Sequence, residues 1–137
     1  METVGPLTLG TAASEHLIGG ATDDLIFGAG GNDTLQGGAG DDMLIAGVGS
    51  STLTGGAGHD IFKLSPGAQV SQITDFAQGQ DRIDLSDWGR LYDMSALTIS
   101  TRSDGALISF GDMTLRVSQA GGGTIPISAW GADDFIF

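Results

Sequence analysis

The sequence predicts an all-β fold, in which a parallel β-roll over residues 1–72 is followed by an antiparallel β C-terminal cap over residues 73–137, packed as one structural unit. Three observations predict this fold. A nine-residue pattern recurs in tandem from Gly10 to Lys63, with a large apolar residue at one fixed position. Glycine is unusually frequent, at 24 of 137 residues. Beyond residue 96, apolar runs alternate with Asp-Gly and Gly-Asp pairs, which are typical of strands joined by tight turns.

The repeat consists of six units, which read GTAASEHLI, GGATDDLIF, GAGGNDTLQ, GGAGDDMLI, AGVGSSTLT and GGAGHDIFK. Their shared pattern is G-G-x-G-x-D-x-U-x, where U is a large apolar residue. The first six positions predict a turn, and the last three predict a short strand whose central residue points inward. That inward column reads Leu17, Ile26, Leu35, Leu44, Leu53 and Phe62. A flexible glycine-rich linker would show no such column.

The turns carry oxygen ligands of two kinds. Glycine allows positive φ, which lets backbone carbonyls point at a central ion, and the sixth position supplies a carboxylate. Carbonyl and carboxylate oxygens together suit Ca²⁺, so calcium is the predicted cofactor. The candidate ligands in the turns are Gly20, Thr22, Asp24, Gly31, Asp33, Gly38, Gly40, Asp42, Gly56, Gly58 and Asp60.

Two units make one coil of 18 residues, so units on the same edge stack two apart, with strands about 4.8 Å from one another. The sixth positions of units two, four and six are Asp24, Asp42 and Asp60. We expect one ion site between the first two of these and another between the last two. The sixth positions of units one, three and five are Glu15, Asp33 and Ser51. We expect weaker or missing sites on that edge, because glutamate is longer and serine is uncharged.

The strands also predict two different outer faces. On one sheet the predicted outward residues are all apolar except the last, Lys63. The set is Leu7, Leu9, Leu25, Phe27, Met43, Ile45, Ile61 and Lys63. On the other sheet they are mostly polar, and they are His16, Ile18, Thr34, Gln36, Thr52 and Thr54. A contiguous apolar face should be covered. We expect the C-terminal half to cover it, the alternatives being an N-terminal domain or a second copy of the chain.

The repeats resemble those of RTX proteins of the hemolysin type, and the segment ITDFAQGQDRIDLS, residues 73–86, resembles the one that follows the calcium roll in serralysin-type secreted metalloproteases. In that family, acidic residues of this segment help to close the last calcium site. The resemblance therefore implies Asp75, Asp81 and Asp84 as further candidate ligands. The alternative is that these aspartates cap turns while the apolar residues between them pack in the core.

Local signals predict the elements of the cap. Ser86 reads as the N-cap of a short helix with Trp88 and Leu91 facing inward. The segment ALTISTRSDGALISFGDMTLRVS predicts three strands, and TIPISAW a last strand or edge that Pro126 limits. The second core that these strands could form consists of Leu97, Ile99, Leu107, Phe110, Leu115 and Val117.

The chain ends in GADDFIF, an acidic residue followed by apolar ones. This closely resembles the C-terminus of type I secreted RTX proteins. The resemblance implies an uncleaved export signal made of Asp134, Phe135, Ile136 and Phe137. The alternative is a terminal strand that buries the two phenylalanines, and both can hold at different times if export precedes folding.

Charge and motifs exclude several function classes. Asp and Glu outnumber Lys and Arg by 17 to 5, for a net charge of −12, which argues against nucleic acid and anionic membranes as partners. No apolar stretch is long enough to span a membrane, and the N-terminus METVGPLTLG has no secretory leader pattern. The two histidines, His16 and His59, lie in different units, and H-E-x-x-H is absent. We therefore expect no enzymatic activity.

The predicted function is that of a calcium-binding RTX module, which would be the C-terminal part of a protein secreted by a Gram-negative bacterium. Such a chain would stay unfolded at cytosolic calcium, leave through type I secretion machinery, and fold outside. An N-terminal catalytic domain is an expected partner. One alternative is an accessory module that binds an alginate-like polyanion, because the repeats resemble modules of secreted mannuronan epimerases and Arg102 and Arg116 lie on predicted neighbouring strands. Another is a calcium-dependent adhesion protein that uses the Thr-rich face.

Overall fold

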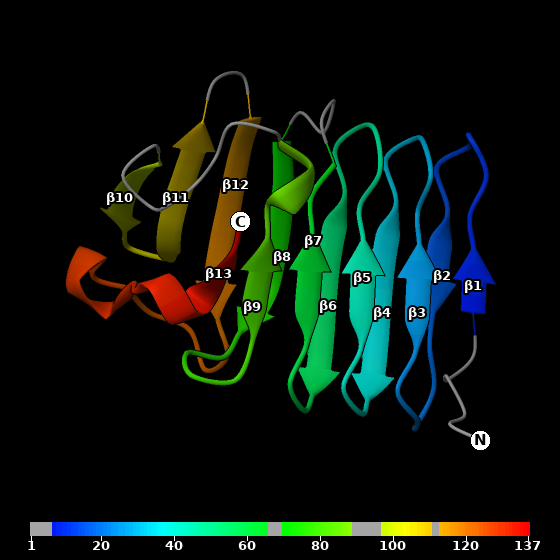
Figure 1. The fold of residues 1–137 in the computed structure, drawn as a ribbon, viewed down its shortest axis with the longest axis horizontal. Coiled ribbons are helices and arrows are strands. Elements are labelled where there is room, and N and C mark those ends of the chain that lie inside the picture. The colour runs from blue at the N-terminus through cyan, green and yellow to red at the C-terminus, as the bar shows by residue number, and fades with distance from the viewer. Residues whose placement is uncertain (1–6, 66–69, 89–96, 111–112) are drawn as a thin grey trace.

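A computed structural model describes residues 7–65, 70–88, 97–110 and 113–137, and these ranges form an all-β molecule (Figure 1). The predicted fold class is confirmed. The strands are β1 (Leu7–Leu9), β2 (His16–Ile18), β3 (Leu25–Phe27), β4 (Thr34–Ala39), β5 (Met43–Ile45), β6 (Thr52–Ala57), β7 (Ile61–Lys63), β8 (Val70–Phe76), β9 (Arg82–Asp84), β10 (Thr98–Arg102), β11 (Gly105–Phe110), β12 (Met113–Gln119) and β13 (Phe135–Ile136). Short 3-10 helices are η1 (Ser86–Trp88), η3 (Ile127–Ala129) and η4 (Ala132–Asp134).

Successive strands alternate between two sheets, as a coil of two nine-residue units requires. One sheet has the order β1-β3-β5-β7-β9-β13, and the other β10-β11-β12-β8-β6-β4-β2. The repeat strands pair in parallel with a register shift of 18 residues, for example Ile26 with Leu44 and Leu35 with Leu53. In Figure 1 the coils stack side by side along the long axis, from β1 at one end to the C-terminal strands at the other.

The core lies between the two sheets and is filled by the eighth residue of each unit. Five members of the predicted inward column have no exposed surface, namely Ile26, Leu35, Leu44, Leu53 and Phe62. Leu17, in the first coil, is partly buried against the same core. The inward column is therefore confirmed, and its period of nine reflects one large inward side chain for each nine-residue unit.

The C-terminal half extends both sheets instead of covering one of them. β9 pairs with β7 and with β13, while β8 joins β6 to the antiparallel hairpins β12-β11-β10. The prediction that this half covers the apolar outer face was wrong. Leu7 and Leu9 remain 58% and 65% exposed, because the unpaired backbone groups at the end of the roll favour further strand pairing over packing on its outside.

Three further expectations for the cap need correction or fall outside the described ranges. The segment TIPISAW contains the 3-10 helix η3 instead of a strand. In β11 it is Ile108 that is fully buried, while Leu107 belongs to the outward-facing row. A one-residue register difference exchanges the two faces of a strand, so the expected core position of Leu107 was wrong. The expected inward packing of Trp88 and Leu91 lies outside the residues whose side chains are described. Within the described ranges, no helix has the length and apolarity to cross a bilayer.

Candidate metal centre

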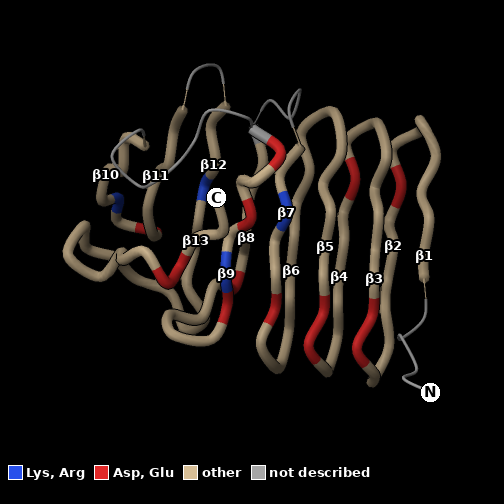
Figure 2. Tube along the Cα trace, in the orientation of Figure 1, with Lys and Arg blue, Asp and Glu red and all other residues tan. Residues whose placement is uncertain are grey.

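The recurring turn positions of the repeat lie along the two edges of the roll. Figure 2 shows acidic segments recurring at corresponding points of successive coils. Along one edge, Asp24, Asp42 and Asp60 are buried, and none of them is more than 4% exposed. Because strands of the same sheet pair in register, the sixth residue of each unit lies directly beside the sixth residue two units later.

Side chain to backbone hydrogen bonds connect these carboxylates into a ladder. The amide of Asp24 donates to Oδ1 of Asp42 at 2.8 Å, and that of Asp42 donates to Oδ1 of Asp60 at 3.0 Å. The amide of Asp60 donates in turn to Oδ1 of Asp81 at 3.0 Å. Asp81 therefore occupies the next rung of the ladder, although the nine-residue pattern ends before it.

Three carboxylates of the turns have an oxygen without a partner. Oδ2 of Asp33, Asp42 and Asp60 is inaccessible to solvent and makes no hydrogen bond. An unpaired buried carboxylate oxygen is energetically costly, and such oxygens in native proteins are usually satisfied by a donor or an ion. The residues present thus fit a hard cation, since a divalent ion would satisfy oxygens that the protein itself leaves unpaired.

Backbone carbonyls pack against the next coil at distances that only glycine permits. A Cβ added at Gly38 would overlap the carbonyl oxygen of Gly20, and one added at Gly40 would lie 2.7 Å from that of Thr22. Both glycines have positive φ, at 104° and 111°. The carbonyls of Gly20 and Thr22 therefore lie against the backbone of the next coil, between stacked turns. The same overlaps recur between Gly56 and Gly38 and between Gly58 and Gly40.

Burial and mutual repulsion perturb the acids of this edge. Burial, together with the nearby charges of Asp81, Asp42 and Asp75, raises the pKa of Asp60 from an ordinary 3.8 to about 7. Burial likewise raises the pKa of Asp42 and Asp81. Each of these carboxylates is therefore held in a place that disfavours its charged form. A cation at this edge would reverse that preference.

Of the three candidates beyond the repeats, the structure brings two to the ladder. Asp81 is its last rung. Asp75, in β8, accepts hydrogen bonds from the amides of Gly55 at 2.9 Å and Gly56 at 2.8 Å, and its charge acts on Asp60 and Asp81.

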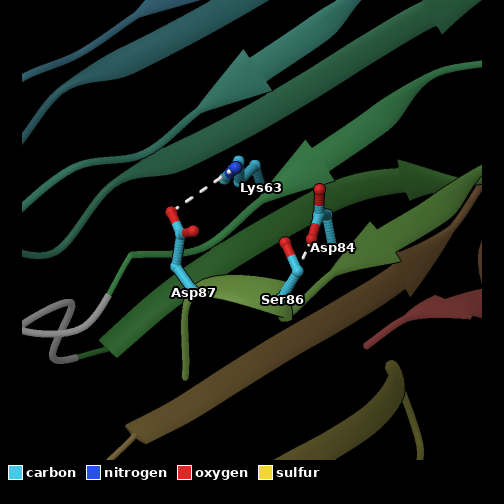
Figure 3. Close-up of polar contacts among 4 residues, drawn as sticks. All are labelled: Lys63, Asp84, Ser86 and Asp87. Atoms are coloured by element: carbon cyan, nitrogen blue, oxygen red, sulfur yellow. Dashed lines mark hydrogen bonds and ion pairs between the residues drawn. The ribbon is translucent and has the colours of Figure 1, made fainter. Parts of the chain in front are cut away.

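Asp84 lies elsewhere. It is at the opposite end of the three-residue strand β9 from Asp81, and its Oδ1 accepts a hydrogen bond from the amide of Ser86 at 2.8 Å (Figure 3). Beside it, Lys63 pairs with Asp87 at 3.4 Å. The structure therefore does not bring Asp84 together with the other candidate ligands, and its carboxylate caps the turn into η1.

In the first and last turns, in contrast, the carboxylate accepts a hydrogen bond from a backbone amide of its own turn. Oδ2 of Asp24 accepts from the amide of Gly20 at 2.6 Å, and Oδ2 of Asp81 accepts from that of Ala77 at 2.9 Å. Oε1 of Glu15 accepts from the amide of Thr11 in the same way. Terminal and interior turns thus differ in whether an oxygen of the sixth residue remains available.

Sequence reasoning missed a second ladder, made by the fifth residue of each unit. The amide of Asp41 donates to Oδ1 of Asp23, and that of His59 donates to Oδ1 of Asp41, both at 2.8 Å. On the other edge, the amides of Asn32 and Ser50 donate to Ser14 and Asn32. These bonds run in the direction opposite to those of the sixth residues. The signal available in the sequence was the short polar residue at the fifth position of most units.

The described residues hold no group of three or more acidic, histidine or cysteine side chains arranged to bind a metal ion. Any cation on these edges would therefore take much of its coordination from backbone carbonyls. That composition agrees with the ligands expected from the turn sequence, where glycine carbonyls outnumber carboxylates.

The C-terminal residues of the candidate export signal are part of the fold. Arg82 donates from Nε to the carbonyl of Asp133 at 3.0 Å and from its guanidinium to that of Phe135 at 2.9 Å. The ring of Phe135 is buried and packs against Trp130, which packs in turn on Phe76. β13 completes the sheet beside β9.

Comparison with known proteins relates the roll to a sequence family and to solved structures. Residues 9–44 and 36–68 match the RTX calcium-binding nonapeptide repeat, in four copies. The AlgE6R3 subunit of the Azotobacter vinelandii mannuronan C5-epimerase is similar at 29% identity, with a TM-score of 0.63 over 93% of this chain and 80% of that one. The AlgE6R2 subunit of the same epimerase is similar at 26% identity, with a TM-score of 0.64 over 88% and 91%. No curated protein matches the chain.

Proposed function

Because residues 9–68 of this chain are RTX calcium-binding nonapeptide repeats, we propose that it is an extracellular module whose folding depends on calcium bound between stacked turns. The observation that carries the proposal is the unpaired, buried oxygen of Asp42 and of Asp60, in turns whose backbone lies close to carbonyls of the preceding coil. Ca²⁺ would supply the positive charge and the oxygen coordination that these turns lack. The residues that would hold it on this edge are Asp42 and Asp60, with carbonyls of the turns at Gly38 and Gly40.

The energetics of the empty chain support dependence on the ion. Ordering the backbone costs about 1–2 kcal/mol per residue, and stacking places like-charged carboxylates on neighbouring coils about 4.8 Å apart. Each short strand contributes only one large side chain to the core. The free energy gained by burying it offsets little of the backbone entropy or of the repulsion between carboxylates. An ion that binds only the folded state adds to stability by mass action. Extracellular calcium modules typically bind at about 10⁻⁴ to 10⁻³ M, well above cytosolic concentrations.

The second part of the proposal is that the C-terminus serves as a type I secretion signal before the chain folds. Asp134, Phe135, Ile136 and Phe137 provide the acidic and apolar residues of such a signal. In the folded chain Phe135 is buried and β13 is paired. A signal built from these residues would be accessible only while the chain is unfolded, which fits export at low calcium and folding outside, as part of a secreted protein from a Gram-negative bacterium.

A titration followed by far-ultraviolet circular dichroism tests the main proposal. We expect little β signal in excess chelator and a cooperative gain on adding CaCl₂, with a midpoint near the concentration of extracellular calcium. The matched variant Asp60→Asn should shift the midpoint to higher calcium, whereas Asp87→Asn, outside the turns, should leave it unchanged. A complete β signal in chelator would contradict the proposal.

A second candidate function is binding of an anionic polysaccharide, which the similarity to subunits of a mannuronan C5-epimerase favours. Arg102 in β10 and Arg116 in β12 are exposed, and the strand registers place them on the same face of the sheet. β11 lies between their strands, so the expectation that these strands are neighbours was wrong. Calorimetry with alginate in the presence of calcium tests this function. Binding should be lost in the double variant Arg102→Ala with Arg116→Ala, and equal binding by that variant would exclude this face.

A further inference from the structure

We propose that the outer face of β1, β3, β5 and β7 docks a short amphipathic helix of a partner protein, with apolar residues on one side of the helix and lysine or arginine along one flank. This face is the one predicted from the sequence to be covered, and the C-terminal strands extend the sheets instead of covering it. The proposal goes beyond calcium binding, because the face includes none of the candidate ligands in the turns.

Two rows of apolar side chains form this face, which we call the apolar strip. The strand register aligns one row across β1, β3, β5 and β7, and the other across the first three of these strands, two residues further along each. The members in β1 are 58% and 65% exposed, and the others are partly exposed. Contiguous apolar surface of this kind marks an interaction site. The strip consists of Leu7, Leu25, Met43 and Ile61 in one row, and Leu9, Phe27 and Ile45 in the other.

The described part of the chain leaves the strip uncovered. There, β3 and β5 contact the neighbouring strands of their own sheet and strands of the facing sheet. The hairpins of the cap lie at the other end of the stack from β1 (Figure 1). The surface is therefore presented by the folded roll.

The size of the strip favours a helix over a second copy of the chain. Four strands about 4.8 Å apart, with two rows of side chains, give a patch of about 19 by 10 Å. A stable dimer buries about 800 Å² on each partner, which is far more than this patch provides. Two chains with a net charge of −12 would also repel each other. A helix is about 10 Å in diameter and rises about 1.5 Å per residue, so about 13 residues would cover the strip.

The spacing of the coils matches the pitch of a helix. Successive coils present side chains about every 4.8 Å along the strip, and successive turns of a helix about every 5.4 Å. A helix that lies along the roll would therefore place one apolar side chain beside each coil, with a mismatch of about 2 Å accumulated over four coils. A longer helix would lose this register, so the strip suits a short segment.

The two margins of the strip differ in charge. Asp23 and Asp41 precede β3 and β5 by two residues and are exposed, while the next residues, Asp24 and Asp42, are buried. The exposed pair therefore lies on the outer side, and Figure 2 shows acidic segments at the start of these strands. The opposite margin carries Val48, which is 57% exposed, and no acidic residue at positions 46–48. Lysine or arginine on one flank of the helix would face the acidic margin, which would fix its orientation more than its affinity.

Binding of a designed peptide to the calcium-loaded full chain tests the proposal. The probe is a peptide of about 14 residues, with leucine along one helical face and lysine elsewhere, followed by fluorescence anisotropy. We expect saturable binding that weakens by about tenfold or more in Ile45→Ser, because a buried apolar side chain is lost. The matched control is Ile18→Ser, which removes the same side chain from the ninth position of a unit in the other sheet. It should leave the affinity unchanged.

A second comparison tests the charged margin. Asp41→Asn keeps the acceptor for the amide of His59 and should weaken peptide binding by about two- to fivefold at low salt. Asp104→Asn changes the net charge equally, but at an exposed position before β11, and should have no effect. A control peptide in which the same leucines and lysines alternate should bind at least about tenfold more weakly, because it is amphipathic as a strand and not as a helix.

Several outcomes would overturn the proposal. They are no saturable binding to a chain that circular dichroism shows to be folded, equal affinities of Ile45→Ser and Ile18→Ser, and equal binding of the alternating peptide. A dimer in sedimentation equilibrium that Ile45→Ser dissociates would assign the strip to a second copy instead. If Ile45→Ser does not fold, the comparison of Asp41→Asn with Asp104→Asn decides. None of these results bears on calcium-dependent folding, which the titration in chelator tests separately.

Discussion

At the scale of single residues, the repeat works through two complementary requirements at each turn. Glycine is needed where the carbonyl of the preceding coil passes close to the backbone, as at Gly56, and the sixth residue carries a buried carboxylate with one unpaired oxygen, as at Asp60. The two requirements are coupled, because close stacking of the turns buries the carboxylate among other acids, and both effects raise its pKa.

Glycines with positive φ should differ in importance according to what surrounds them. Gly56→Ala should destabilise the calcium-loaded fold by more than about 2 kcal/mol, because the Cβ meets both an unfavourable φ and the carbonyl of Gly38. Gly122→Ala should cost only about 1 kcal/mol, since its Cβ would have nothing within 4 Å. Urea denaturation at fixed calcium measures both, and equal losses would contradict the close-approach argument.

In excess chelator, the calcium-free fold should gain stability as the pH falls below about 7, the folded-state pKa of Asp60. Because this pKa is raised above the unfolded value of 3.8, the folded state binds a proton between these two pH values that the unfolded chain does not bind, and the proton removes charge that otherwise repels the neighbouring carboxylates. The gain should reach at most about 1.4 kcal/mol per pH unit. Circular dichroism in chelator from pH 8.5 to 5.5 measures it as a growing β signal. Asp60→Asn should flatten the dependence, and a β signal independent of pH in the unmodified chain would refute it.

At the scale of secondary-structure elements, short strands become stable by stacking. Each of β3, β4 and β5 buries one large side chain and pairs with the strands 18 residues before and after it. Two opposed ladders of side chain to amide bonds, from the fifth and sixth residues, hold each turn to both neighbours. Register is thus specified at the turns as well as by the apolar column.

The central member of that column should be sensitive to truncation. Leu44→Ala should destabilise the folded chain by about 2–5 kcal/mol, because Leu44 is fully buried between neighbouring coils and its loss leaves a cavity. Met43→Ala, at the adjacent outward position, should cost much less. Thermal denaturation in saturating calcium compares the two, and similar losses would argue against the alternation of faces.

The terminal strand β13 depends on a contact from β9. Arg82→Gln should loosen residues 133–137 by about 1–3 kcal/mol, since the guanidinium donates to two of their carbonyls. Hydrogen exchange of the amides in this segment measures the change, which should leave the exchange of β3 and β5 unaffected. Unchanged protection near the C-terminus would show that the packing of Phe135 suffices without the arginine.

At the scale of the whole molecule, the roll and the cap share both sheets. The strand order runs without interruption from the repeat strands through β8 and β9 to the C-terminal strands. Phe62 of the last repeat packs on Phe76, which packs on Trp130. The cap thereby pairs the end of the roll, whose strands would otherwise expose unpaired backbone groups and invite association.

Because the sheets are continuous, the chain should unfold as one cooperative unit. Circular dichroism, which reports the β-sheets, and tryptophan fluorescence, to which Trp130 in the cap contributes, should give coincident urea transitions at fixed calcium. Both transitions should move together when calcium is raised. Two separated transitions would instead indicate that the cap folds independently of the repeats.

The repeat in the sequence was enough to predict the β-roll, its inward column and the calcium-binding family. The fixed period of nine residues, with a characteristic residue type at most positions, predicts the length of a coil and the residues that stack on one another in successive coils. The stacking of Asp24, Asp42 and Asp60 followed from this spacing alone. The cap was less predictable, because its strands join β8 and β9 through long-range pairing, and an error of one residue displaced Leu107 from the core to the outer face.

Only the tertiary structure decided which candidate ligands lie together and which carboxylate oxygens stay unpaired. It placed Asp81 and Asp75 at the last turn, and placed Asp84 at the other end of its strand. It also gave Asp33 the same unpaired oxygen as Asp42, despite the serine opposite. The physical reason is that periodicity is a property of neighbouring residues along the chain. The satisfaction of a buried oxygen depends instead on donors that reach it from other coils and on the conformation of its own turn.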